Sequence, residues 1–418
     1  MRIEDMVLVS VDDHVVEPPD MFDGHVPDRL ADQAPRVVLD DNGAASWVFG
    51  NSRANPVGLN AVASWPKEDW GFDPVGFAEM RPGCYDVGER LLDMDANGVH
   101  ASLNFPTMAH FSGRFFMNAG DLDLAHVMVR AYNDWILDEW CGADPERLIP
   151  LVIGPLWDPE LMAAEVRRSA AKGARALSFT EAPHQLGLPS LHSGEWDPLF
   201  EALCDEGVVL ALHIGSGGSM PTTSPDAPID VMITLPTQLS LQVASDLVWG
   251  PVLRQFPELR VALSEGGSGW VPSFLERIDR SYRNQTWTGQ DFGDLLPSDV
   301  FREHVLTCFI TDRSGIKLRD DIGIENLAWE CDFPHSDSTW PRSPELLMAE
   351  FVGADVSDDD IDAITHRNAR RFFGLGALGA GVREQVNVGA LRARSADVDT
   401  GTTSRAEYRA RHAAAAGG

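Results

Sequence analysis

Residues with metal-binding or acid–base side chains stand at the ends of several apolar runs in the sequence. The residues are Asp12, His14, His213, Glu265, Asp332 and His335. Carboxylate oxygens and imidazole nitrogens are the ligands that Zn²⁺, Mn²⁺ and Fe²⁺ take in proteins. A bound divalent ion lowers the pKa of water from 15.7 to about 7, which supplies hydroxide at neutral pH. This set of residues therefore predicts a metal-dependent enzyme, if the fold brings them together.

The spacing of the first residues supports this hypothesis. The run MVLVSV is followed by Asp12, Asp13 and His14. Side chains alternate along a strand, so Asp12 and His14 point to one side and Asp13 to the other. A pair spaced in this way can bind one ion from a single strand. The alternative for Asp12 is an acidic strand end that faces water.

The other residues also have ordinary structural explanations. His213 could be a core histidine with a hydrogen-bond partner, and Asp332 could accept hydrogen bonds within a turn. Glu265 could be an acid that the dipole of a following helix favours. His335 either lines a pocket or is a turn residue that orients Asp337. The argument for a metal site thus depends on the joint placement of these residues.

Eight short apolar runs alternate with helical stretches along the chain. The runs begin at Met6, His100, Arg147, Ala174, Val208, Leu259, Val305 and Asn326. Runs that are apolar along most of their length are typical of parallel strands covered on both faces. The pattern predicts an α/β protein with a (β/α)₈ TIM barrel, whose active site lies at the carboxyl ends of the strands. A doubly wound sheet is the alternative, but DDHVVEPPDMF replaces the glycine-rich turn expected after its first strand.

Two stretches interrupt the repeat. Residues 31–87 include RVVLDDNGAASWVF, in which an Asn-Gly turn between strand-like runs predicts a β-hairpin. We expect this insertion to cap the barrel mouth, within a barrel domain spanning residues 1–376. Residues 377–418 are rich in Gly, Ala, Arg and Ser, and we expect this tail to be peripheral or disordered.

Composition excludes several classes of partner. The formal net charge of the 418-residue chain is −31, which disfavours nucleic acid and anionic membrane surfaces. No apolar run approaches the roughly 20 residues that span a bilayer, and the N-terminus lacks the pattern of a signal peptide.

The five cysteines are scattered without a CxxC pair, which indicates reduced thiols. We therefore expect a cytoplasmic protein.

The chain resembles the amidohydrolase superfamily, in particular the branch of aminocarboxymuconate semialdehyde decarboxylase and related aromatic-acid decarboxylases. The motifs that carry the resemblance are SVDDHVVEP, NFPTM, YNDWILDEW, DPERLIPL, LHIGSGG, SEGGSGWVPSFLERID and WECDFPHSDSTWP. They extend from the first expected strand to THRNARRFFGL and so cover most of the chain. Together they are specific for the family but not for a substrate.

The resemblance implies a barrel with a single divalent metal ion. Zinc is the first choice, with manganese or iron as alternatives. The family's ligand positions fall on Asp12, His14, His213 and Asp332. The family often has a histidine on strand six that assists proton transfer, and Glu265 stands there in this chain. Strand four ends in SFTEAP and offers no lysine for a second metal.

The first functional interpretation is hydrolysis of a small organic substrate by metal-activated water. Asp332, Glu265 and His213 would be the catalytic residues, and His335, Arg114 and His110 would bind substrate. The alternative is non-oxidative decarboxylation of an aromatic or unsaturated carboxylic acid. Hydrolysis is preferred here because Glu265 replaces a histidine typical of the decarboxylases. A ligand-binding barrel without turnover is a third possibility, and the resemblance implies a homodimer or a higher homo-oligomer.

Overall fold

A computed structural model describes residues 1–54, 56–71, 73–379 and 381–416 of the chain, which divides into two compact units. The first unit comprises Met1–Pro155, Cys331–Leu346 and Leu378–Gly418. The second comprises Leu156–Glu330 and Leu347–Ala377. Among the helices of the described residues, none is both long and apolar enough to cross a bilayer.

Each of the eight apolar runs contains a β-strand at the expected place. The strands are β1 (Leu8–Val15), β5 (Val99–Pro106), β6 (Leu148–Ile149) with β7 (Leu151–Ile153), β8 (Ala176–Thr180), β9 (Val209–His213), β10 (Val261–Ser264), β11 (Val305–Phe309) and β12 (Leu327–Trp329). The third run is divided at Pro150, which has no N–H to donate to a ladder. The eighth ends at Trp329, so Asp332 lies beyond its strand and not within it.

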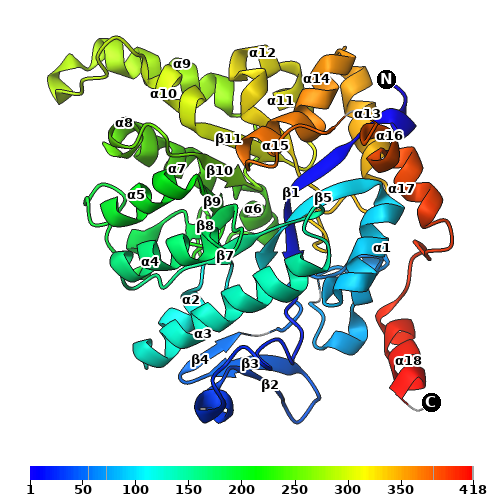
Figure 1. Cartoon of the computed structure of the whole chain (residues 1–418). Coiled ribbons are helices and arrows are strands. Elements are labelled where there is room, and N and C mark those ends of the chain that lie inside the picture. Colours follow the sequence, from blue (N-terminus) through cyan, green and yellow to red (C-terminus); the bar gives the residue numbers. More distant parts are fainter. Residues whose placement is uncertain (55, 72, 380, 417–418) are drawn as a thin grey trace. The chain divides into compact units, whose positions relative to one another are not determined.

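Parallel pairing within the first unit joins β1 to β5 and β5 to β6. The register between β1 and β5 shifts between Ser10 and Asp13, just where the candidate ligands begin. Helices α1 (Val87–Asn97) and α3 (Leu122–Trp135) belong to this unit (Figure 1). Each starts at an aspartate whose side chain accepts a backbone N–H of the first turn, as helix N-caps do.

In the second unit, β8 to β12 pair in parallel and in chain order. All five strands are buried along their length, which explains their nearly continuous apolar sequences. The helices of this part of the chain include α4 (Pro159–Ala170), α5 (Asp197–Glu206), α7 (Thr237–Trp249), α9 (Val271–Asn284) and α10 (Pro297–His304). The α/β class with parallel sheets is confirmed, while closure into one barrel stays a prediction.

Further helices lie in the connections of both units (Figure 1). They are α2 (Arg114–Met117), α6 (Ile229–Thr234), α8 (Val252–Gln255), α11 (Arg313–Lys317), α12 (Arg319–Ile322), α13 (Ser343–Gly353), α14 (Asp358–Asp362), α15 (Asn368–Phe372) and the 3₁₀ turn η4 (Phe77–Glu79).

An antiparallel hairpin forms within residues 31–87. Strands β2 (Arg36–Leu39) and β3 (Ala45–Phe49) pair around the Asn-Gly turn, and β4 (Ser52–Ala54) pairs with β3. The Asp40 carboxylate accepts two backbone N–H groups of the turn and fixes its shape. The hairpin is therefore where the sequence places it, and its role as a cap stays a prediction.

The described part of the tail carries three helices. They are α16 (Arg383–Val386), α17 (Val388–Arg394) and α18 (Arg405–Ala416). Val388 and Leu391 of α17 are buried, as is Tyr408 of α18. These apolar anchors stand among small and charged residues, which explains why composition alone favours disorder for this stretch.

Candidate metal centre

Three buried side chains of the first unit form a compact cluster. The Nε2 atom of His14 lies 3.3 Å from Oδ1 of Asp332, and the Nδ1 atom of His335 lies 3.0 Å from the same oxygen. The two imidazole rings stack with their centroids 3.8 Å apart. One ligand atom from each residue lies within 4.8 Å of the other two. This arrangement is compatible with a single divalent cation.

Asp12 joins the same cluster. Its Oδ1 atom lies 3.4 Å from the Nε2 atom of His14, and its side chain is fully buried. A water-facing role for Asp12 is therefore wrong. The alternation predicted for β1 holds, because Asp12 and His14 meet on one side of the strand.

The donors of the cluster suit a metal ion chemically. Burial alone would raise the pKa of Asp332, but the adjacent imidazoles of His335 and His14 hold its pKa below the ordinary range. The buried Nε2 atom of His335 has no hydrogen-bond partner among the described residues. Buried carboxylates and imidazoles at these distances are the ligand types of Zn²⁺ and Mn²⁺.

Backbone pairing brings Asp332 to β1. Its N–H donates to the carbonyl of Asp12 at 2.8 Å, and the N–H of His14 donates to the carbonyl of Phe333 at 2.7 Å. Asp332 has a φ of 59°, an uncommon conformation for a residue with a side chain. Such strained residues persist where their surroundings hold them, often at functional sites.

Asp13 points to the opposite side of β1, as alternation predicts. Its carboxylate accepts the N–H of Phe333 at 2.8 Å and the hydroxyl of Ser102. Burial raises the pKa of Asp13 to about 7, although the charge of Arg90 acts against this increase. Asp13 therefore holds the residue next to Asp332 in place.

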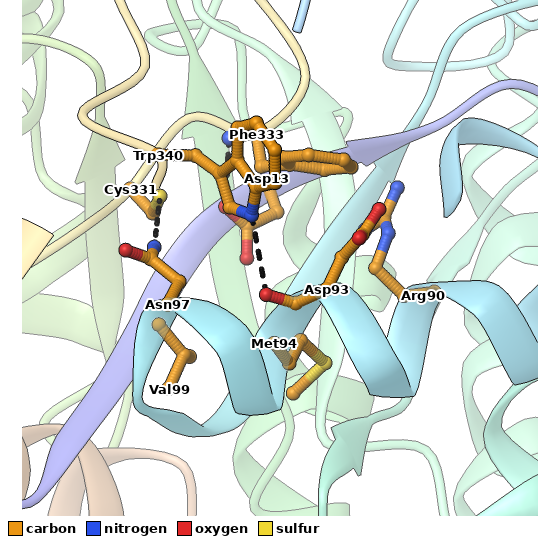
Figure 2. A pocket seen from close by; sticks show the side chains of 9 residues that line it. All are labelled: Asp13, Arg90, Asp93, Met94, Asn97, Val99, Cys331, Phe333 and Trp340. Carbon is orange, nitrogen blue, oxygen red and sulfur yellow. Dashed lines mark hydrogen bonds between the residues drawn. The ribbon is translucent and has the colours of Figure 1, made fainter. Parts of the chain in front are cut away.

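Sequence analysis missed Arg90, a fully buried guanidinium on α1 that lines a small pocket together with Asp13 and Phe333 (Figure 2). It donates to the carbonyls of Gly83 and His14. It also lies 4.6 Å from the ring centroid of Phe333. The pocket has a volume of about 10 Å³, room for roughly one water molecule. One feature could have indicated that Arg90 is buried. It stands four residues before Met94, so both side chains lie on the same face of α1, and that face is turned inward.

His213 and Glu265 lie together in the second unit. The Nδ1 atom of His213 is 2.6 Å from the carbonyl oxygen of Ile214, which favours a proton on Nδ1. If His213 binds a metal ion, as predicted, the ligand atom would then be Nε2. That Nε2 atom lies 3.4 Å from Oε2 of Glu265. Glu265 has a φ of 59°, and its N–H donates to Glu330 at 3.1 Å. Their participation in one site with Asp12, His14 and Asp332 stays a prediction.

Glu181 at the end of β8 is a second residue that sequence analysis missed. Its side chain is buried and contacts the hydroxyl of Ser216, which also lies 2.7 Å from the carbonyl oxygen of His213. Burial raises the pKa of Glu181. The contact orders the glycine-rich loop that follows His213.

The predicted substrate-binding residues His110 and Arg114 lie in the turn after β5 and at the start of α2. His110 and Phe111 both have positive φ values, of 54° and 61°. The ring of Phe111 lies 5.2 Å from that of His14, between centroids. The turn thus presents an aromatic side chain to the cluster, while the roles of His110 and Arg114 stay predictions.

The contribution of His110 to the stability of the chain should fall in mild acid. Burial, with the nearby charge of Arg114, lowers the pKa of His110 to about 4. The unfolded chain binds a proton near pH 6.5, so the folded state loses stability as the pH falls from about 6.5 towards 4. The expected loss of this contribution from pH 7 to pH 5 is about 2 kcal/mol. Urea unfolding of the unchanged chain and of His110→Asn, which tolerates the positive φ, measures it: between pH 7 and pH 5 the stability difference between the two proteins should change by about this amount in favour of the variant, and an unchanged difference would contradict the assignment.

Glu17 anchors the loop after β5. Its buried carboxylate accepts the N–H groups of Thr107 and Met108 at 3.0 and 2.8 Å, and the hydroxyl of Tyr132 at 3.2 Å. Burial raises the pKa of Glu17 to about 7, and these donors act against it.

We expect Glu17→Gln to lower the free energy of unfolding by about 1–3 kcal/mol at pH 8, since one buried N–H loses its acceptor. Chemical denaturation measures this change. Glu139→Gln is the control, because that carboxylate is exposed. Equal stability of the two variants would show that the three contacts contribute nothing.

Comparison with known proteins places the chain in a family. The family model described as amidohydrolase matches residues 22–375. A search of curated protein sequences gives no match. Among solved structures, the chain is similar to an amidohydrolase from Mycobacterium avium subsp. paratuberculosis, with 22% identity, a TM-score of 0.67, and coverage of 88% of this chain and 99% of that one.

Two further similar structures are decarboxylases. One is 5-carboxyvanillate decarboxylase from Novosphingobium aromaticivorans in complex with manganese and 4-hydroxy-3-methoxy-5-nitrobenzoic acid (18% identity, TM-score 0.60, 90% of this chain and 98% of that one). The other is 2,6-dihydroxybenzoate decarboxylase from Rhizobium (17% identity, TM-score 0.55, 88% and 99%). At these identities the similarity shows the fold. With the family model covering most of its length, the chain belongs to the amidohydrolase family.

Proposed function

We propose that this protein is a metal-dependent decarboxylase of an aromatic or unsaturated carboxylic acid. The observation that carries the proposal is the buried cluster of His14, Asp332 and His335 with aromatic rings beside it. The rings of Phe105 and Phe111 lie 6.0 and 5.2 Å from that of His14, between centroids. Apolar walls favour loss of charge from a carboxylate, and two structures of this fold are decarboxylases of benzoate derivatives.

The proposed ligands of one divalent ion are Asp12, His14, His213 and Asp332. Zinc was the first choice from the sequence. Manganese is now an equal candidate, because the similar structure of 5-carboxyvanillate decarboxylase contains manganese. Such an ion, when bound, holds the substrate carboxylate and withdraws negative charge from the organic group. His335, stacked on His14, would keep Asp332 oriented and contact the substrate.

Glu265 is the proposed proton donor. As the bond between the carboxylate carbon and the ring carbon breaks, its electron pair stays on the ring carbon and CO₂ leaves. The carboxyl of Glu265 gives its proton to that carbon and regains it from solvent. His110 and Arg114 would bind polar groups of the substrate, and a homodimer or higher homo-oligomer remains part of the proposal.

Hydrolysis of a small amide, ester or lactone is the second candidate. The carboxylate of Glu265, beside His213, favours it, because a carboxylate can accept a proton from attacking water. In that case Asp332 would pass a proton to the leaving group. The two reactions differ in product, so one comparison of products separates them.

The test is a product screen with protein loaded with Mn²⁺ or with Zn²⁺. Hydroxybenzoates and unsaturated acids are assayed for CO₂ release, beside amides, esters and lactones for hydrolysis. We expect CO₂ release by the metal-loaded protein and its loss after chelation. Hydrolysis without CO₂ release would transfer the assignment to the second candidate, and no metal uptake would contradict both.

A further inference from the structure

Residues 60–65 of the first unit contact the loop that carries Asp332. The N–H of Ala63 donates to the carbonyl of Pro334 at 3.0 Å. The side-chain amide of Asn60 donates to the hydroxyl of Ser336 at 3.1 Å. Both acceptors lie within four residues of Asp332, so the position of residues 60–65 bears directly on this loop.

Helix α18 and Thr403, which lies just before it, contact residues of the same segment. The hydroxyl of Tyr408 lies 2.6 Å from that of Ser64, whose carbonyl accepts the N–H of Thr403 at 2.9 Å. The ring of Tyr408 packs with Val62 and Trp65 in a small apolar cluster. Residues more than 330 positions apart in the chain thus form one contact.

A buried carboxylate stabilises the contact between α18 and residues 60–65. Glu79 is only 2% exposed, and its two oxygens pair with Arg405, at 3.0 Å, and with Arg409. The carbonyl of Glu79 accepts the indole N–H of Trp65 at 2.9 Å. A buried carboxylate depends on such cations, because charge is costly away from water. Arg405 and Arg409 therefore hold α18 against Glu79 and Trp65.

The backbone of residues 60–65 is in a conformation that it would not favour alone. Asn60 and Ser64 have φ values of 52° and 66°, in the left-handed region. This conformation is unfavourable for a serine and persists where the surroundings enforce it. Ser64 forms hydrogen bonds with both Thr403 and Tyr408, and these contacts hold it in this conformation.

We propose that helix α18 holds residues 60–65 in the conformation that fixes the loop of residues 332–336. Arg405, Tyr408 and Arg409 are then positioning residues for the metal centre, although none of them contacts a candidate ligand. The part of this inference that concerns metal affinity rests on the proposed function; the part that concerns the order of the loop does not.

The test compares four full-length proteins: the unchanged chain, the double variant Arg405→Ala/Arg409→Ala, Tyr408→Phe and Arg394→Ala. Arg394 is a matched control, because it donates to the carbonyl of Gln385 within the tail. Hydrogen exchange is measured at Ala63 and across residues 332–336, and calorimetry measures Mn²⁺ affinity. All measurements are made at a temperature at which circular dichroism shows every protein folded.

We expect the double variant to exchange at least about tenfold faster at Ala63 and in residues 332–336. Its Mn²⁺ affinity should fall about 10- to 100-fold, the effect of losing an outer-shell partner. Tyr408→Phe should also speed exchange and weaken Mn²⁺ binding, but by less. If the double variant does not fold, the comparison is made with Tyr408→Phe alone. Arg394→Ala should match the unchanged chain.

Faster exchange in α18 with unchanged exchange in residues 332–336 would overturn the proposal, because the helix would then be only a surface attachment. If the unchanged chain takes up no Mn²⁺, the proposed function fails. In that event the exchange of residues 332–336 decides whether α18 positions the loop.

Discussion

Asp332→Asn should abolish turnover while the chain keeps its fold. The substitution removes a charged oxygen that His14 and His335 both approach, at 3.3 and 3.0 Å. An amide of the same shape leaves the packing intact but is a poor ligand for a divalent ion. We expect metal affinity and turnover to fall by more than the roughly 10- to 100-fold that follows removal of a residue hydrogen-bonded to a metal ligand.

Metal-induced stabilisation measures this effect without a substrate. A metal ion that binds only the folded state stabilises it by about 2.7 kcal/mol at 100 times its Kd. The unchanged chain should therefore melt at a higher temperature with Mn²⁺, and Asp332→Asn should not. Asp337→Asn is the matched control, because it removes a carboxylate from the same connection and leaves the cluster complete. Full turnover by folded, metal-loaded Asp332→Asn would refute the assignment of this ligand.

Features that depend on local sequence could be predicted well. All eight apolar runs contain strands because both faces of each strand are buried, so that periodicity, length and position agree. The opposite orientations of Asp12 and Asp13 follow from strand geometry alone. The β2–β3 hairpin follows from its Asn-Gly turn.

Features that depend on distant contacts could not be predicted. Asp332 reaches His14 by backbone pairing of its own segment with β1, which no local pattern encodes. His335 contacts Asp332 and stacks on the ring of His14, which comes from the other end of the chain; its role in substrate binding stays a prediction. Helix α18 of the tail depends on the ion pairs that Arg405 and Arg409 form with Glu79, more than 320 positions away in the chain. Composition averages over the whole segment, so it does not reveal the few residues whose contacts hold the segment in place.

Arg90→Met should be among the most destabilising single substitutions in the first unit. The guanidinium is fully buried and donates to Gly83, Asn104 and His14. Its removal leaves three buried oxygens without their donor and takes away the positive charge that acts to lower the pKa of the buried Asp13 carboxyl. We expect a cost of about 3–5 kcal/mol, because polar and charged groups that lose their partners away from water are expensive. Denaturant unfolding at pH 8, above the pKa of Asp13, measures the loss.

A double-mutant cycle distinguishes loss of the electrostatic interaction between Arg90 and Asp13 from loss of packing and hydrogen bonds. Asp13→Asn in the Arg90→Met background removes the isolated charge, so it should recover part of the lost stability. Arg147→Met is the matched control, since that guanidinium pairs with Asp95 at 2.8 Å and also donates to main-chain carbonyls, but is partly exposed. It should cost less and leave Mn²⁺ affinity unchanged, whereas Arg90→Met should weaken Mn²⁺ binding through the backbone of His14. Equal losses of stability and affinity in both arginine variants would mean that Arg90 supports the fold in general and not the metal centre.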